Sequence, residues 1–303
     1  MSRRWTPRLL QPVVAGLRGA VRFGAPLKDY TSFRIGGPAD ALVQPADVDD
    51  LCRLVRQARR ARAPLFVLGG TNVLVRDGGI RGVVVSLMHL TRIHEEPGAV
   101  LYGEAGIGMP KLMQAASKRG LSGLEWAAGI PGTLGGCIVM NAGTKLGEMS
   151  QSVKALRMVS PTGELRDVPR SELAFRYRRS TLPKGIVAGA WLQLKAGSPE
   201  DIAQRVKDYL RYRKDTQPLT EPNAGCVFKN PGGHTAGGLV EQAGLKGRRV
   251  GDAEVSTKHA NFIVNRGQAR AKDVTTLIAA VKRAVKARTG QSLELEVKIV
   301  GEP

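Results

Sequence analysis

The chain has 303 residues, of which 42% are hydrophobic, and 46 Lys or Arg against 26 Asp or Glu give a formal net charge of +20. This length allows one large domain or two to three smaller ones with a substantial core. No apolar run approaches the ~18–20 residues that cross a bilayer, which excludes a spanning helix. The three cysteines form no C-x-x-C pair, which argues against a disulfide framework or structural zinc.

The N-terminus is basic, with Arg3, Arg4 and Arg8, but Pro7 and Pro12 interrupt any apolar core of a signal peptide. We therefore expect no export and a cytoplasmic protein. After this lead, Tyr30–Gly37 is predicted to form a strand followed by a turn.

Further along the chain, apolar spacing and cap residues predict alternating helices and strands. Asp47 is suited to cap a helix that begins at Val48, and Pro110 and Gly120 bracket a second helix. Short runs rich in β-branched residues predict strands, and apolar residues at helical spacing predict the later helices. The predicted strands are Leu65–Leu68, Val83–Leu87, several within 158–194, Phe262–Val264 and Val297–Val300; the later helices are 202–213 and one through Val274–Val285 that Gly290 closes.

This order predicts a mixed α and β fold with an N-terminal block of two lobes and a C-terminal α/β lobe. The excess of basic residues raises nucleic acid as a partner. However, the basic residues alternate with apolar faces of predicted helices, and aromatic residues are only 5% of the chain, with no stacking platform. Solvated helix surface explains the charge better, and a polyanionic small molecule is the other open alternative.

The segment Gly129–Cys137, continued by Met140–Gly143, is rich in glycine, so backbone N–H groups can be approached closely by a phosphate. A second small-residue turn, Leu68–Leu74, follows an apolar run. Neither segment is a Walker loop or a dinucleotide-binding fingerprint. Two such turns suggest two walls around a pyrophosphate ligand, with ordinary tight turns as the alternative.

Three polar residues stand in unusual settings. Arg178 lies among aromatic residues and other arginines, which suits recognition of a carboxylate or phosphate, although an exposed basic turn is the simpler interpretation. Cys226 lies in a glycine turn near Lys229 and suits proton exchange, although a lone cysteine is more often a small buried hydrophobe. Glu296 shares one face of a predicted strand with Glu294, a face that is usually the solvated one.

His259 is predicted to be structural. The histidines are scattered, so we expect no metal site.

Taken together, these segments resemble the UDP-N-acetylenolpyruvoylglucosamine reductase (UDP-N-acetylmuramate dehydrogenase) family over Pro26–Gly301. The resemblance rests on ordered motifs: Tyr30–Ala39, Val67–Gly79, Ala128–Gly143, Phe175–Ser180, Gln217–Pro231, Ala236–Gly247, Gly251–Asn265 and Leu293–Gly301. It implies a two-lobed FAD-binding domain of the vanillyl-alcohol-oxidase-like (PCMH-type) class plus a C-terminal α/β substrate-binding domain. The implied boundaries are 1–90 for FAD-binding lobe 1, 91–200 for lobe 2 and 201–303 for the substrate-binding domain.

The resemblance also implies the cofactors. FAD would be held non-covalently, NADPH would reduce it, and UDP-N-acetylglucosamine enolpyruvate would then be reduced to UDP-N-acetylmuramate in peptidoglycan precursor synthesis. The residues implied for the FAD pyrophosphate are Gly69, Gly70, Thr71, Asn72, Ile130, Pro131, Gly132, Thr133, Gly135 and Gly136.

For catalysis, the resemblance implies that Arg178 stabilises the enolate-like charge, that Glu296 pairs with this arginine at the carboxylate and that Cys226 donates the proton. Lys229 and Asn230 would reach the substrate diphosphate and sugar. Cys226 replaces the family's usual serine, and an unperturbed thiol, with a pKa of ~8.5, is a stronger acid than a serine hydroxyl. We expect activity to be retained, with new sensitivity to alkylation and peroxide.

A second departure is the upstream turn Leu68–Asn72, which is one glycine shorter than the family's usual turn. The chain length predicts the compact type, without the substrate-capping insertion, and we expect a monomer that binds neither nucleic acid nor membrane. Two alternatives stay open: a FAD- or UDP-sugar-binding relative without turnover, and a flavin oxidase of the same superfamily.

Overall fold

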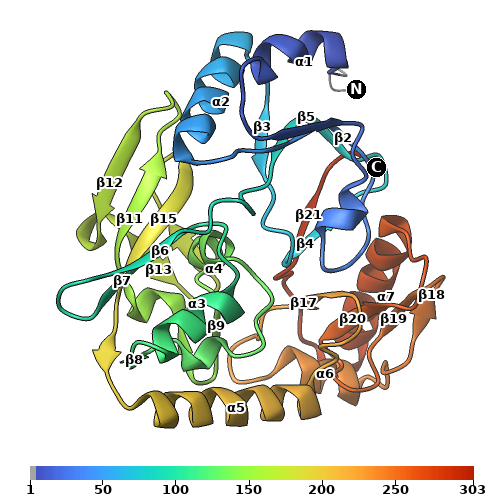
Figure 1. Ribbon diagram of the computed structural model, residues 1–303. Coiled ribbons are helices and arrows are strands. Elements are labelled where there is room, and N and C mark those ends of the chain that lie inside the picture. The colour runs from blue at the N-terminus through green and yellow to red at the C-terminus, as the bar shows by residue number, and fades with distance from the viewer. Residues whose placement is uncertain (1–4) are drawn as a thin grey trace. The chain divides into compact units, whose positions relative to one another are not determined.

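The computed structural model describes residues 5–303 (Figure 1), so Arg3 and Arg4 lie outside the described residues. The chain divides into two compact units. Unit 1 comprises the residues up to Gly24, Asp40–Gly69 and Gly82–Tyr212, and unit 2 comprises Ala25–Ala39, Gly70–Arg81 and Arg213–Pro303. The three predicted lobes stay a prediction.

Unit 1 combines a four-stranded and a five-stranded sheet with helices. The four-stranded sheet has the order β1 (Ala20–Phe23), β2 (Ala39–Gln44), β5 (Ile80–Val85) and β3 (Leu65–Val67). The five-stranded antiparallel sheet has the order β12 (Leu165–Pro169), β11 (Val153–Val159), β15 (Ile186–Gln193), β7 (Val100–Glu104) and β6 (Ile93–Glu96). The helices are α1 (Pro7–Val14), α2 (Val48–Ala61), α3 (Met109–Ser117), α4 (Leu134–Met140) and α5 (Pro199–Thr216), whose last residues cross into unit 2. Three short strand pairs complete the unit: β8 (Leu121–Ser122) with β16 (Lys195–Ala196), β9 (Gly143–Thr144) with β10 (Gly147–Glu148), and β13 (Ala174–Arg176) with β14 (Arg179–Thr181).

Unit 2 is built on a four-stranded antiparallel sheet and a parallel strand pair. The sheet has the order β17 (Asn223–Cys226), β20 (Phe262–Asn265), β19 (Ala253–Val255) and β18 (Arg249–Val250). The parallel pair is β21 (Lys298–Val300) with β4 (Val73–Val75), and the helices are α6 (Ala236–Gln242) and α7 (Ala271–Thr289).

One helix begins, and another ends, where the sequence predicts. The Asp47 carboxylate accepts a hydrogen bond from Asp50 N at 2.9 Å at the start of α2, which satisfies one of the unpaired amides of the first turn. Gly290 ends α7 in the left-handed conformation, with φ +71°. The apolar positions of α7 are buried in the core of unit 2: Val274, Leu277, Ile278, Val281 and Val285.

Two predicted strands are wrong. Residues 27–30 form a 3₁₀ turn (η1, Leu27–Tyr30), and no strand follows before residue 39, because this segment bonds back to its own glycines: Leu27 N donates to Gly37 O at 3.1 Å. Residues 293–296 lie outside regular strands and make a single bridge, Leu295 with Phe228. Glu294 and Glu296 therefore do not share the face of a strand.

No helix within residues 5–303 is long and apolar enough to cross a membrane. Nor do the described residues contain a group of three or more His, Cys, Asp or Glu side chains placed to hold a metal ion.

Candidate functional site

The two glycine turns predicted to hold a pyrophosphate meet in unit 1. A Cβ atom built on Gly69 would lie 3.9 Å from Gly136 Cα, and one built on Gly136 would lie 3.5 Å from Thr133 Oγ1. Any larger side chain at either position would enter the space between the turns. The residues present therefore fit a ligand that needs close approach to backbone, as a flavin dinucleotide does.

The second half of the glycine-rich segment is a helix, not a loop. Helix α4 begins after Thr133, whose Oγ1 accepts from Gly136 N at 3.4 Å. Gly135 N donates to Ala105 O at 2.8 Å, and a Cβ at Gly135 would lie 2.9 Å from Ala105 Cβ. Gly135 is thus required by packing, and its amide is already bonded within the protein.

Substitution of Gly69 by valine is expected to raise the dissociation constant for FAD at least tenfold, about 1.4 kcal/mol, because the side chain fills the gap facing Gly136. Stability of the FAD-free protein should change by no more than ~0.5 kcal/mol, since Gly69 is exposed. Fluorescence titration of the apoprotein with FAD measures the dissociation constant, and denaturant unfolding measures the stability. Gly232→Val is the matched control, because a Cβ there meets nothing within 4 Å; equal FAD affinity of both variants would contradict the placement.

The rest of the upstream turn belongs to unit 2. Gly70 is left-handed, with φ +79°, and a Cβ there would lie 2.8 Å from Tyr30 O, so only glycine fits. Asn72 Nδ2 donates to Glu296 O at 3.2 Å, and Asn72 O accepts from Lys298 N at 3.2 Å. Asn72 therefore fixes the main chain that carries Glu296.

Arg178 lies at the tip of the β13–β14 hairpin, in the two-residue turn between Arg176 and Arg179. Its φ is +55°, a left-handed conformation that is uncommon for arginine. Arg178 is half-buried, whereas Arg176 and Arg179 are exposed. A Cβ on Gly143 would lie 3.1 Å from Arg178 Nη1, so glycine at 143 permits the guanidinium to approach β9.

The hairpin is held against α4 by hydrogen bonds. Asn141, fully buried and left-handed, ends α4; its Nδ2 donates to Arg176 O at 3.0 Å and its Oδ1 accepts from Ser150 N at 3.0 Å. Ser180 Oγ donates to Val139 O at 2.7 Å. The structure thus fixes Arg178 to the helix whose first turn faces Gly69.

Cys226 and Glu296 are brought together within unit 2. Glu296 N donates to Val227 O at 2.9 Å, directly after Cys226, and both residues are half-buried. Asn261 secures the segment that follows Cys226: its Oδ1 accepts from Phe228 N at 3.0 Å and its Nδ2 donates to Phe228 O at 2.8 Å. Two segments about seventy residues apart in sequence therefore form one irregular ribbon.

Lys229 and Asn230 continue this ribbon. Lys229 N donates to Glu294 O at 2.9 Å, and its ammonium forms an ion pair with the Glu294 carboxylate. Asn230 Oδ1 accepts from Ala236 N at 2.9 Å, so this oxygen supports the start of α6. Their predicted contacts with substrate diphosphate and sugar stay predictions.

Sequence reasoning assigned no role to Asn141, Asn261 or Ser32, which hold these segments in place. The side chain of each forms a hydrogen bond with backbone that is distant in sequence. A single asparagine or serine in a sequence does not indicate which backbone group it will bond. Asn141 ends helix α4 in the left-handed conformation, a position where asparagine is common, but the sequence predicted a loop here and not a helix.

His259 is half-buried and packs as a structural residue. Its Nδ1 accepts from Asn261 N at 3.2 Å, and a Cβ on Gly237 of α6 would lie 3.3 Å from its Cε1. Burial holds the pKa of His259 below its usual value. The histidine is therefore neutral in the folded protein at neutral pH.

This shift predicts a pH dependence of stability. Because the folded pKa lies below the unfolded value of ~6.5, the contribution of His259 is complete above that pH and is lost as pH falls toward the folded pKa. Denaturant unfolding between pH 7.5 and 5.5 should show a smaller loss of unfolding free energy for His259→Gln than for the native chain. Exposed His234→Gln serves as the control, and identical slopes for the native chain and His259→Gln would refute the assignment.

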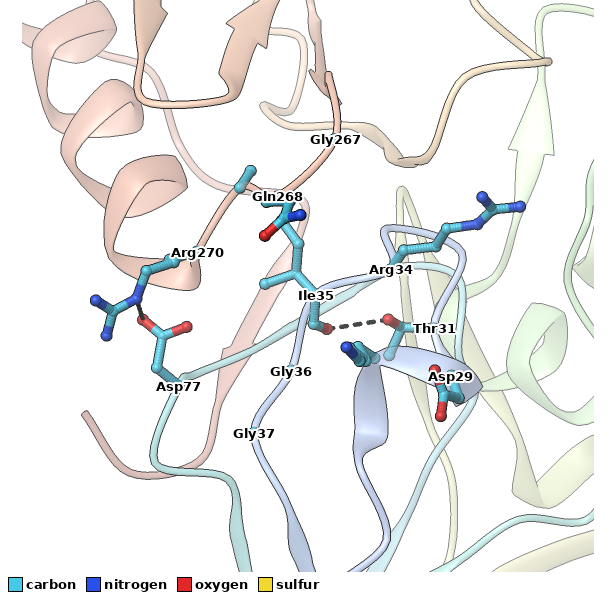
Figure 2. A pocket seen from close by; sticks show the side chains of 12 residues that line it. Asp29, Thr31, Arg34, Ile35, Gly36, Gly37, Asp77, Gly267, Gln268 and Arg270 are labelled. Carbon is cyan, nitrogen blue, oxygen red and sulfur yellow. Dashed lines mark hydrogen bonds and ion pairs between the residues drawn. The ribbon is translucent and has the colours of Figure 1, made fainter.

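A separate cavity of about 860 Å³ lies in unit 2 (Figure 2). It contains none of the predicted site residues; its lining residues are Lys28, Asp29, Thr31, Arg34, Ile35, Gly36, Gly37, Asp77, Gly267, Gln268, Ala269 and Arg270. The Asp77 carboxylate accepts from Ala271 N and Lys272 N at the start of α7, and the amides of residues 267–270 bond to Asn265, Asp252 and Asp273. The backbone amides at this part of the cavity are thus hydrogen-bonded to side chains of the protein itself.

Comparison with known proteins defines the class first. A family model described as "FAD binding domain" matches residues 39–169. BBE-like 1 of Physcomitrella patens shares the fold, with a TM-score of 0.50 and 17% identity over 62% of this chain and 44% of that one. The chain is a flavoprotein with a PCMH-type FAD-binding domain, which confirms the predicted fold class and FAD.

The more specific matches define the family. A model described as "UDP-N-acetylenolpyruvoylglucosamine reductase, C-terminal domain" matches residues 217–300. UDP-N-acetylenolpyruvoylglucosamine reductase 2 of Symbiobacterium thermophilum is 47% identical over 287 residues, which cover 93% of each chain. The crystal structure of the reductase from Thermus caldophilus has 41% identity and a TM-score of 0.80, covering 94% of this chain and all of that one. The chain belongs to the UDP-N-acetylenolpyruvoylglucosamine reductase family and is an FAD-dependent oxidoreductase.

Proposed function

We propose that the chain reduces the enolpyruvyl group of UDP-N-acetylglucosamine enolpyruvate to give UDP-N-acetylmuramate, a step of peptidoglycan precursor synthesis, with NADPH as the electron source. The observation that carries this proposal is the ribbon that joins Cys226 to Glu296 through the Glu296 N to Val227 O hydrogen bond. This bond supports the proposal because it holds the segments of Cys226 and Glu296 side by side. The left-handed turn that carries Arg178 supports it further.

Each of these residues then has a definite role. The turns at Gly69 and Gly136 would hold FAD, which, once reduced by NADPH, would supply the hydride for the terminal carbon of the double bond. The Arg178 guanidinium stabilises the negative charge that develops on the adjacent carbon and its carboxylate, as a preorganised donor does. The Cys226 thiol gives its proton to that carbon, and Glu296 acts beside the substrate carboxylate.

The outer parts of the substrate are polyanionic. Lys229, held beside Glu294, suits its diphosphate, and Asn230 suits its sugar. The length of the chain supports the compact type without a substrate-capping insertion.

The direct test is turnover with NADPH and the enolpyruvyl sugar under exclusion of oxygen. The expected product carries two more hydrogens than the substrate by mass spectrometry, in equal amount to the NADPH consumed. The same assay is then repeated in air, where hydrogen peroxide formed in proportion to NADPH, with no reduced sugar, would instead favour a flavin oxidase. Binding of both ligands without any product would favour a relative that has lost turnover.

A further inference from the structure

Ser32 joins two parts of unit 2 that the proposed function uses separately. Its Oγ donates to Asn223 O at 2.7 Å and lies 3.4 Å from Thr71 O. Its backbone N donates to Gly70 O at 2.7 Å. Ser32 therefore contacts the upstream glycine turn through its backbone and the start of β17 through its side chain.

Asn223 connects Ser32 to the turn that precedes Cys226. Its Oδ1 accepts from Gly225 N at 2.8 Å, and its Nδ2 donates to Pro218 O and Glu221 O at 3.0 and 2.7 Å. The turn thus formed needs Gly225, whose φ is +75°. The position of Cys226, next in the chain, depends on how Asn223 is held.

The turn on the other side has little freedom. Gly70 approaches Tyr30 O so closely that only glycine fits, and Asn72 of the same turn holds Glu296 O. A ligand that contacts Gly70–Asn72 therefore acts on both backbone segments of the ribbon. Ser32 links this turn to the Cys226 segment, and Asn72 links it to the Glu296 segment.

We propose that Ser32 is a positioning residue that couples occupancy of the FAD turn to the geometry of the Cys226 segment, so that FAD and the UDP-sugar substrate strengthen each other's binding. This inference rests on the proposed function, because it takes Gly70–Asn72 as an FAD contact and the Cys226 segment as a substrate contact. By linkage, the factor by which substrate tightens FAD equals the factor by which FAD tightens substrate.

The test is a binding cycle on the full chain without NADPH, so that no turnover occurs. The dissociation constant of FAD is measured with and without saturating UDP-N-acetylglucosamine enolpyruvate. We expect substrate to tighten FAD about fivefold or more in the native chain, within the usual range of coupling. In Ser32→Ala this factor should fall at least threefold, and Ser32→Thr, which keeps the hydroxyl, should restore it.

Thr31→Val is the matched control, because the Thr31 hydroxyl donates to Ile35 O at 3.0 Å within the same segment and not to β17. It should lower stability while leaving the coupling factor unchanged. An unchanged factor in Ser32→Ala, or a factor of one in the native chain with substrate bound, overturns the inference while the proposed function stands. Failure of the native chain to bind the substrate overturns both.

Discussion

Replacement of Cys226 by alanine is expected to lower kcat for enolpyruvyl reduction by ~10²–10⁴-fold, the usual contribution of a positioned general acid. Reduction of the flavin by NADPH should proceed at the native rate, because that half-reaction does not use the thiol. Stopped-flow measurement of the two half-reactions separates these effects. Cys226→Ser, which introduces the family's usual residue and supplies an O–H donor in place of the S–H donor, should retain most of the activity.

The thiol also makes the protein selectively sensitive to alkylation. Cys52 and Cys137 are buried, and burial raises the pKa of both, that of Cys137 to about 12. Cys226 is half-buried in its glycine turn. Iodoacetamide at pH 8 should therefore inactivate the native chain and leave Cys226→Ser active. Native kcat in Cys226→Ala would exclude Cys226 as the donor. Equal inactivation of the native chain and Cys226→Ser would show that the alkylation-sensitive group lies elsewhere.

Substitution of Arg178 by glycine should lower kcat by ~10²–10³-fold, or ~3–4 kcal/mol, through loss of a preorganised charge donor. Glycine adopts a φ of +55° without steric cost, so the hairpin should fold with equal or greater stability. Steady-state kinetics tests the predicted fall in kcat, and thermal unfolding tests the predicted stability of the hairpin.

Arg179→Met is the matched control, because Arg179 is exposed on the adjacent strand of the same hairpin. It should keep native kcat. Loss of stability together with activity in Arg178→Gly would show that the arginine maintains the hairpin and does not act on the substrate.

The sequence alone predicted the elements whose signals are local. Helices α2 and α7 have their caps and apolar spacing within the helix itself, so Asp47 and Gly290 mark their ends. The segment 30–37 was not predictable, because its backbone is fixed by distant partners: Ser32 bonds to Asn223, and Asn265 Nδ2 donates to Phe33 O at 3.2 Å.

Helix α4, at the candidate site, was also not predicted from the sequence. Glycine is a poor helix former, so Gly135 and Gly136 indicated a loop. Close packing of Gly135 on Ala105 stabilises the helix through a contact that no local pattern reveals. Local setting singled out Arg178, Cys226 and Glu296, and the family's motifs predicted their catalytic roles. The asparagines that hold their backbone segments were found only in the structure.

The most direct test of the whole account is the visible spectrum of the purified, FAD-loaded protein during an anaerobic titration, first with NADPH and then with UDP-N-acetylglucosamine enolpyruvate. We expect a yellow protein that bleaches with NADPH and recovers its colour in proportion to the enolpyruvyl sugar added. A protein that bleaches but is not reoxidised by the sugar would contradict the assigned substrate, and one that takes up no FAD would contradict the cofactor site at Gly69 and Gly136.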